Sequence, residues 1–321
     1  MCELKSPFPV GEAKTYDSTP LLVDRKRALL AAYQAKAKWL KEHRIYFFRP
    51  YEETEGKSEQ DGFLRSPCHV RLAVGSNRSG KTTVGVLDDI ARAIGFRPWE
   101  LPDELKKFNI EDLMGPDNWR VPDSCRTPLK LPAKILIVVE DWEVADDILV
   151  TGTLDRAGKI THYLPPSAIA AREKNSLGYY NRWILKNGSV IAIDTEKSFS
   201  NNPKSFEGAV WDQVHYDEPK RRDLRVALAR GLVDTAGYET FTFTPLTEPW
   251  VKDEIYDKAG VDPEIASFFL LATKNPYISK VGGAHFVSKL DETEKAARAE
   301  GQWVHLRWLV YANFKPRKYP E

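Results

Sequence analysis

The chain has 321 residues, of which 47 are basic and 46 acidic, and this balanced charge argues against a histone-like or polybasic polymer binder. Apolar residues make up 42% and charged residues 29%, which excludes wholesale disorder, and the longest apolar runs fall far short of the roughly 18 residues that cross a bilayer. The start lacks an apolar signal region and the three cysteines are widely spaced, so we expect a cytosolic globular protein without a disulfide framework, a structural metal or a membrane anchor.

The N-terminal part, residues 1–45, is predicted to form an arm and a helix. About 20 residues rich in proline, lysine and serine come first. Leu30, Tyr33, Ala37 and Leu40 then recur at steps of three and four residues, as on one face of an amphipathic helix. The other faces are basic, which indicates a solvated surface or, as the alternative, a surface that touches DNA.

Strand and helix patterns alternate through residues 46–275, the predicted core. The predicted elements are strands at 70–74, 133–139, 210–216, 240–244 and 268–272, helices at 80–94 and 142–155, and a basic helix before residue 240. Segments 183–186 and 189–192 flank Asn187-Gly188, which favours the type I′ turn of a β-hairpin. Such alternation predicts a mostly parallel α/β sheet flanked by helices, with a surface insertion at about 96–132.

The sharpest motif is GSNRSGKT, which satisfies GxxxxGK[ST] between a predicted strand and a predicted helix. Its glycines let the backbone wrap closely around phosphates, and the following helix N-terminus adds partial positive charge. Lys81 would reach the β- and γ-phosphates, and the Thr82 hydroxyl would bind Mg²⁺. We therefore predict a nucleotide-binding loop made by Gly75, Ser76, Asn77, Arg78, Ser79, Gly80, Lys81, Thr82 and Thr83.

Two carboxylates end the apolar strand Val214-His215-Tyr216-Asp217-Glu218. Asp217 could hold the water shell of a metal, and Glu218 could polarise an attacking water. A small-molecule kinase usually lacks the second carboxylate, because its acceptor substrate is the nucleophile. The pair therefore predicts a nucleoside triphosphate hydrolase, and His215, in the middle of the same strand, is expected to be a packed core histidine.

The strand after this one ends in Thr242-Phe243-Thr244-Pro245. Its hydroxyl groups could hydrogen-bond the attacking water or the catalytic carboxylate and so relay the state of the γ-phosphate. The alternative is a threonine-rich strand that simply ends at a proline turn.

Together, GSNRSGKTT, GAVWDQVHYDEP and TFTPLTEPW resemble the large terminase subunit of tailed bacteriophages, the motor that packages DNA into a procapsid. The resemblance extends from about Gln60 to Phe314. It implies a P-loop ATPase core of the ASCE, RecA-like type that uses ATP and Mg²⁺. The implied roles are Lys81 and Thr82 as Walker A, Asp217 as Walker B and metal holder, Glu218 as catalytic base, Thr242 and Thr244 as coupling residues, and Gln60 as the residue that recognises adenine.

The resemblance also implies partners. These are double-stranded DNA, a portal protein, a small terminase subunit and further copies of the chain in a ring, all in the host cytoplasm. The family often places a trans-acting arginine in the loop that is 198–206 here, but this loop has Lys204 and no arginine. Arg78 in the P-loop and Arg230 could each take the place of the trans-acting arginine, and the sequence does not favour one over the other.

A basic helix follows the Asp-Glu strand, and its side chains Arg221 and Arg222 are candidates for contacting DNA, although a solvated surface is the default interpretation. Residues 276–321 are predicted to form a lid or linker, with a helix at 285–300 and a strand at 303–311. The family's nuclease domain would begin near 309–314, so we expect no nuclease activity. Asp291, Glu292 and Glu294 fit a solvated helix face better than a metal cluster.

Three other functions compete with a packaging motor. A helicase shares the first three motifs but needs a second domain of about 150 residues, and too few residues follow Pro245. A small-molecule kinase is the second alternative, and ATP turnover without an acceptor would decide against it. A non-catalytic nucleotide-dependent scaffold is the third, and it would have little reason to keep Glu218.

Overall fold

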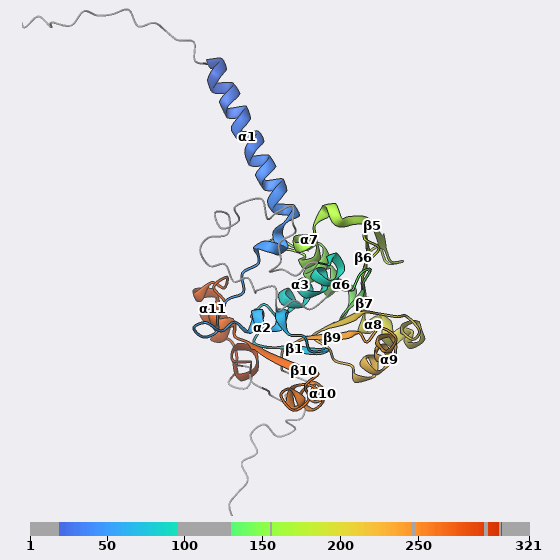
Figure 1. Cartoon of the computed structure of the whole chain (residues 1–321). Coiled ribbons are helices and arrows are strands. Elements are labelled where there is room, and N and C mark those ends of the chain that lie inside the picture. The colour runs from blue at the N-terminus through green and yellow to red at the C-terminus, as the bar shows by residue number, and fades with distance from the viewer. Residues whose placement is uncertain are drawn as a thin grey trace, which may run out of the picture. The chain divides into compact units, whose positions relative to one another are not determined.

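A computed structural model describes residues 19–95, 130–154, 156–245, 248–291, 295–301 and 303. The chain divides into two compact units, residues 1–41 and 42–321. The first contains most of helix α1 (Thr19–Glu42), in agreement with the predicted amphipathic helix, whereas the predicted arm before it lies outside the described residues (Figure 1). Among the described residues, no helix combines the length and the apolar character needed to span a membrane.

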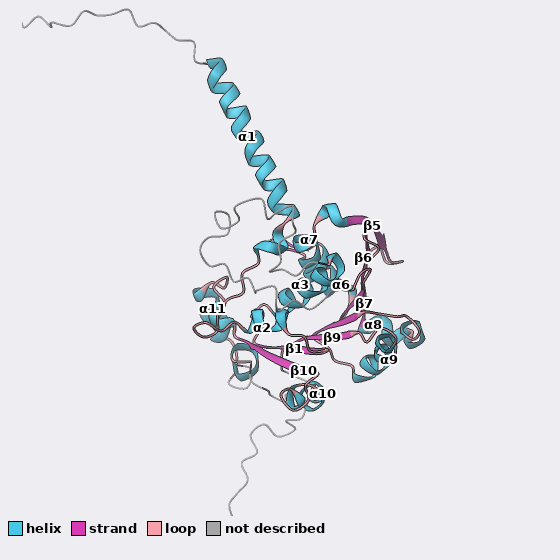
Figure 2. Cartoon of the chain, in the orientation of Figure 1, coloured by secondary structure: helices cyan, strands magenta, loops and turns pink. Residues whose placement is uncertain are grey.

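The second unit is built on an eight-stranded sheet with the order β10-β1-β9-β8-β2-β7-β6-β5 (Figure 2). The strands are β1 (Val70–Gly75), β2 (Lys134–Val139), β5 (Ile169–Lys174), β6 (Tyr180–Leu185), β7 (Val190–Thr195), β8 (Gln213–Asp217), β9 (Tyr238–Phe243) and β10 (Ile265–Leu270). From β10 to β7 all neighbours are parallel, and β5, β6 and β7 pair antiparallel. The structure thus confirms the predicted mostly parallel sheet and the hairpin around Asn187-Gly188.

Helices cover both faces of this sheet (Figure 1). The described helices of this unit are α2 (Glu59–Arg65), α3 (Lys81–Ile94), α6 (Trp142–Ala145), α7 (Lys159–Tyr163), α8 (Glu196–Asn201), α9 (Arg222–Val233), α10 (Pro249–Glu254) and α11 (Lys280–Val287). Short strands β3 (Gly152–Thr153) and β4 (Arg156–Ala157) form a separate pair.

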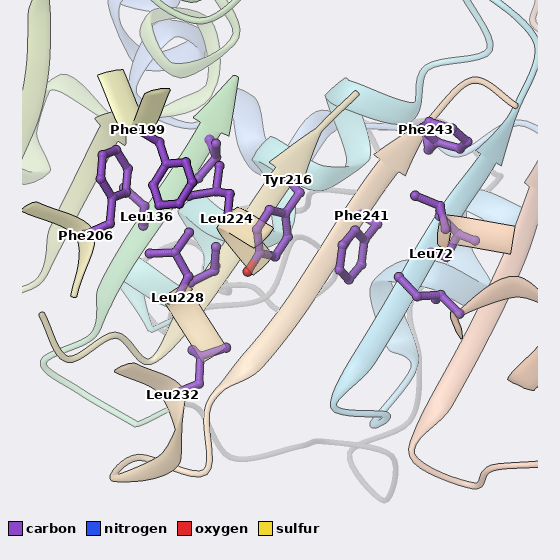
Figure 3. Packing of buried hydrophobic residues seen from close by; sticks show 14 of the residues in the cluster. Leu72, Leu136, Phe199, Phe206, Tyr216, Leu224, Leu228, Leu232, Phe241 and Phe243 are labelled. Carbon is purple, nitrogen blue, oxygen red and sulfur yellow. The ribbon is translucent and has the colours of Figure 1, made fainter. Parts of the chain in front are cut away.

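One face of the sheet is apolar and packs against α8, α9 and α10. In β8, Val214 and Tyr216 point to this face, and the Tyr216 ring stacks on Phe241 of β9 with centroids 4.7 Å apart (Figure 3). In α9, Leu224 and Leu228 recur at a four-residue step, so one stripe of the helix enters this core. Burying such side chains contributes about 1.5–3 kcal/mol each, so this face contributes substantially to stability.

The opposite face carries buried charged and polar side chains beneath α3. Arg71 of β1 donates to both carboxylate oxygens of Asp88, at 2.9 and 2.6 Å. Gln213 of β8 donates to Asp88 at 3.0 Å and to Asp89 at 2.6 Å. Removing one partner of such a buried pair typically costs about 3–5 kcal/mol, because an uncompensated charge remains. These side chains tie β1, α3 and β8 together beyond the backbone ladder.

The strand order brings the predicted motifs together at the edge of the sheet formed by the carboxyl ends of its strands. Because β1, β9 and β8 are adjacent and parallel, their carboxyl ends lie together. Ala73 pairs with Thr242, and Thr242 pairs with Asp217. The glycine-rich loop leaves β1 at this edge, and α3 begins there.

Several predicted elements have different bounds. The helix predicted at 142–155 is α6 followed by a π-helical segment, Asp146–Val150, and it ends where the β3–β4 turn begins. At Gly152 (φ +84°) an added Cβ would lie 2.0 Å from the Arg156 carbonyl oxygen, so the chain makes a tight turn there. The strand predicted at 210–216 begins at Gln213, because the Trp211 amide bonds instead to the carbonyl of Gly231 in α9.

The C-terminal predictions fare differently. The helix predicted at 285–300 is wrong in its bounds: α11 ends at Val287, and a π-helical segment follows at Lys295–Ala299. The predicted strand at 303–311, apart from Trp303, and most of the predicted insertion at 96–132 lie outside the described residues.

Candidate active site

The glycine-rich loop between β1 and α3 has backbone conformations that residues other than glycine rarely adopt. Gly75 (φ +155°) and Gly80 (φ +91°) lie in the left-handed region, and Arg78 adopts a φ of 64°. A Cβ at Gly75 would lie 2.0 Å from the carbonyl oxygen of Leu270 in β10. Both glycines of the motif are therefore needed for the loop to turn between strand and helix.

Neighbouring segments hold this loop in place. The Ser76 hydroxyl accepts from the amide of Ala272 at 2.8 Å, and Asn275 donates to the carbonyl of Arg78 at 2.8 Å. The Asn77 amide donates to the Arg298 carbonyl, also at 2.8 Å. The described part of the predicted lid thus contacts the loop, which is preorganised from several directions.

Lys81 opens α3 and lies almost fully buried behind the loop. It is 5% exposed, and its Nζ donates to the Ser76 carbonyl at 2.8 Å and lies 3.9 Å from Oε1 of Glu218. Burial lowers the pKa of Lys81, while the charges of Glu218 and Asp217 act in the opposite direction. A buried ammonium group beside the loop amides favours binding of an anion, because a buried charge needs an opposite charge nearby.

Thr82 and Asp217, the two predicted metal holders, are brought together. The Thr82 hydroxyl donates to Oδ1 of Asp217 at 2.8 Å, and the Thr242 hydroxyl donates to the same oxygen at 2.5 Å. Thr83 lies half-buried in the same first turn of α3. A hydroxyl and a carboxylate in contact supply the hard oxygen ligands that Mg²⁺ prefers.

Glu218 directly follows β8 in a left-handed conformation, with φ 52°. Its amide donates to the Thr242 carbonyl at 2.8 Å, and its carboxylate accepts from Thr244 twice, from the amide at 2.8 Å and from the hydroxyl at 2.6 Å. Crowding by protein atoms raises the pKa of Glu218 against the opposing effect of Lys81. Since 44% of the side chain stays exposed, we expect this rise to be limited. The predicted base and coupling residue are in direct contact.

Gln60, the predicted adenine-recognising residue, lies in helix α2, where it is 3% exposed. Its amide group donates to the Ser79 carbonyl at 3.3 Å, and its Oε1 accepts from the Tyr51 amide at 3.3 Å. The Tyr51 hydroxyl also donates to the Ser79 carbonyl, at 2.8 Å. Sequence reasoning missed Tyr51, and no local pattern could have found it, because its partners are distant in the chain.

The arginines of the predicted basic helix each have an acidic partner. Arg221 pairs with Asp223, Arg222 pairs with Glu254, and Arg230 pairs with Glu207. The latter two arginine side chains remain more than half exposed, so they stay available to a partner at a modest electrostatic cost.

The residues present fit a nucleotide with Mg²⁺. The Ser79 hydroxyl, inside the loop, is buried and lacks a hydrogen-bond partner in the structure. Within the described ranges, no group of three or more His, Cys, Asp or Glu side chains could hold a metal alone. A metal at Thr82 and Asp217 would therefore depend on phosphate oxygens and water, which is how Mg²⁺ is usually bound.

No protein-family model matches the sequence, and no curated protein is significantly similar to it. Solved structures are similar in fold. The large terminase of a thermophilic bacteriophage aligns with a TM-score of 0.53 and 15% identity over 80% of this chain and 54% of its own. The structure of the same protein in complex with ADP aligns with a TM-score of 0.52 and 15% identity over 79% of this chain and 54% of its own. A mutant ATPase domain of the Thermus phage P74-26 large terminase aligns with a TM-score of 0.50 and 12% identity over 81% of this chain and 97% of that domain.

This chain spans about half the length of the first protein, in both of its structures, and nearly all of the second, which is an ATPase domain. The second unit thus has a mostly parallel sheet flanked by helices whose arrangement is shared with large terminases. By its structure, the chain has the fold of a large terminase ATPase domain.

Proposed function

We propose that this chain is the ATP-hydrolysing motor domain of a viral DNA-packaging terminase large subunit. The observation that carries the proposal is the meeting of Lys81, the Thr82–Asp217 pair and Glu218 at one edge of a sheet shared with large terminase ATPase domains. A phosphate-binding loop beside a metal-holding carboxylate and a second carboxylate is suited to hydrolysis of a phosphoanhydride.

Binding and orientation are the work of the loop and of Lys81. The amides of the loop and the first turn of α3 would hold the phosphates, with Lys81 at the β- and γ-phosphates. Gln60 and Tyr51 fix the Ser79 carbonyl, and we propose Gln60 as the residue that recognises adenine. Thr82 and Asp217 would hold Mg²⁺, which neutralises charge that develops on the phosphate oxygens.

Glu218 would act as the general base. Its carboxylate would take a proton from the attacking water, and Lys81 at 3.9 Å would keep the carboxylate near the γ-phosphate. Both carboxylate oxygens accept from Thr244, so release of the Thr244 hydroxyl would free Glu218 for water. Thr244 Oγ1 also lies 3.3 Å from Asn77 Oδ1 in the loop, which links the coupling residue to the phosphate site.

The wider proposal concerns DNA and partners. Hydrolysis would drive translocation of double-stranded DNA into a procapsid, with a portal protein and a small terminase subunit as partners, a homo-oligomeric ring as the working form and the host cytoplasm as the place. Arg221, Arg222 and Arg230 are candidates for contacting DNA or a neighbouring subunit. Arg78, exposed at the tip of the loop, is a candidate to stabilise transition-state charge.

We expect the purified chain to be a slow ATPase that assembly stimulates. The loop at 198–206 supplies Lys204 but no arginine, and a trans-acting arginine contributes about 10³-fold or more in rate. Phosphate release per molecule should be measured over a range of protein concentrations, with and without double-stranded DNA and with no small acceptor present. Fast turnover independent of concentration would contradict this expectation, and turnover only with an acceptor would favour a kinase.

We also expect the chain not to cut DNA. A two-metal nuclease needs carboxylates that hold ions about 4 Å apart, and Asp291, the described member of the candidate acidic cluster, is exposed. Supercoiled plasmid incubated with the protein in Mg²⁺ or Mn²⁺ should stay intact. Nicking that disappears in an Asp291→Ala, Glu294→Ala variant would reveal a nuclease, although Glu294 lies outside the described residues.

A further inference from the structure

A chain of hydrogen bonds runs behind the candidate metal site through buried side chains. Asp89 Oδ2 lies 2.6 Å from His215 Nδ1, and His215 Nε2 lies 2.9 Å from the Thr242 hydroxyl. Thr242 in turn lies 2.5 Å from Asp217 Oδ1. None of Asp89, His215 and Thr242 has measurable exposure, and Asp217 is 6% exposed. The histidine predicted to be a packed core residue therefore has both ring nitrogens engaged.

The direction of these bonds follows from the chemistry of the groups. An ionised Asp217 can only accept, so Thr242 donates to it through its single proton. The Thr242 oxygen must then accept from His215, which assigns a proton to Nε2 of the ring. Asp89 faces the other ring nitrogen, and its second oxygen accepts from Gln213 at 2.6 Å. In this series of hydrogen bonds, Asp89 thus orients His215, His215 orients Thr242, and Thr242 orients Asp217.

Helix α3 fixes the ring from the side. A Cβ added at Gly85 would lie 2.4 Å from Cε1 and 2.6 Å from Nε2 of His215, and 2.9 Å from Cγ2 of Thr242. A glycine inside a helix costs about 1 kcal/mol relative to alanine. The close approach gives a reason for glycine here, one turn after Lys81, and it leaves the ring little room to rotate.

We infer that His215 is a positioning residue for the metal site: through Thr242 it orients the Asp217 carboxylate toward Mg²⁺. A merely structural histidine would be a costly choice, because a polar pair without exposure packs no better than apolar side chains of similar volume. His215 is not a catalytic residue, since it contacts Asp217 only through Thr242. The inference rests on the proposed nucleotide and Mg²⁺ site.

The test compares nucleotide binding with and without the metal. ATPγS affinity is measured by titration calorimetry in Mg²⁺ and in EDTA. The ratio of the dissociation constant in EDTA to that in Mg²⁺ reports the metal site without requiring turnover. Loss of an outer-shell partner typically costs about 10–100-fold in metal affinity. We expect His215→Leu to reduce this ratio about tenfold while affinity in EDTA stays near the wild-type value.

Further variants separate positioning from folding. His215→Gln, whose amide can donate to Thr242, should restore part of the ratio. His215→Leu combined with Thr242→Val should be no worse than Thr242→Val alone, because both changes break the same chain. His69→Leu, at a half-buried histidine before β1 that pairs with Glu264, is the matched control and should behave as wild type.

If His215→Leu does not fold, as judged by circular dichroism, Gly85→Ala decides, because its methyl group displaces the ring and should lower the same ratio. A folded His215→Leu or Gly85→Ala variant with the wild-type ratio would overturn the inference but leave the proposed function standing. A parallel loss of affinity in Mg²⁺ and in EDTA would overturn it too, in favour of a structural role. A wild-type chain that binds no ATPγS would instead refute the proposed function on which the inference rests.

Discussion

Glu218→Gln should reduce ATP turnover by about 10²–10⁴-fold, the typical contribution of a positioned general base. ATP binding should remain close to wild type. The substitution keeps the size of the side chain, and the Thr244 hydroxyl can turn to accept from the new amide. What disappears is the group that takes a proton from water. Phosphate release in single turnover and ATP affinity by calorimetry measure the two effects separately.

Glu207→Gln serves as the matched control for this prediction. Glu207 precedes β8, at the opposite end of the strand from Glu218, and its exposed side chain pairs with Arg230. Its loss should leave turnover unchanged. If Glu218→Gln hydrolysed ATP at the wild-type rate, the general base would have to be another residue.

Lys81→Ala should weaken nucleotide binding itself. A hydrogen bond to a charged group contributes about 1.5–3 kcal/mol, which corresponds to about ten- to hundredfold in the dissociation constant. Burial lowers the pKa of Lys81 and so disfavours its charge, and an added phosphate would restore the balance. Calorimetric titration with ADP and with ATPγS measures the loss, which should be larger for the nucleotide with the γ-phosphate.

Lys134→Ala provides the control for the lysine. Lys134 begins β2 at the sheet edge opposite the loop, and it is exposed. Its removal changes the net charge by the same amount without touching the candidate site. Equal affinities for wild type and Lys81→Ala would contradict the assignment of the loop.

The sequence predicted best what depends on local stereochemistry. The glycines of the loop, the Asn187-Gly188 turn and the carboxylates after β8 each impose a backbone or a chemistry that few other patterns share. His215 is buried in β8 as predicted, but the hydrogen-bond partners of His215 and Gln60 were not predicted, because they are distant in sequence. Tyr51 reaches the carbonyl of Ser79, and Asp89 of α3 reaches His215 of β8. Period and propensity carry no record of such tertiary contacts.

The strand order has a consequence for how this protein acquires activity. Thr82 and Asp217 are separated by 135 positions, and the strand order β1-β9-β8 brings them into contact. Parallel pairings between distant segments are slow to form, since loop-closure entropy is lost before contacts are gained. No early folding intermediate that lacks β9 in this place could complete the candidate site. Nucleotide would then bind only the completed sheet and, by mass action, protect it from unfolding.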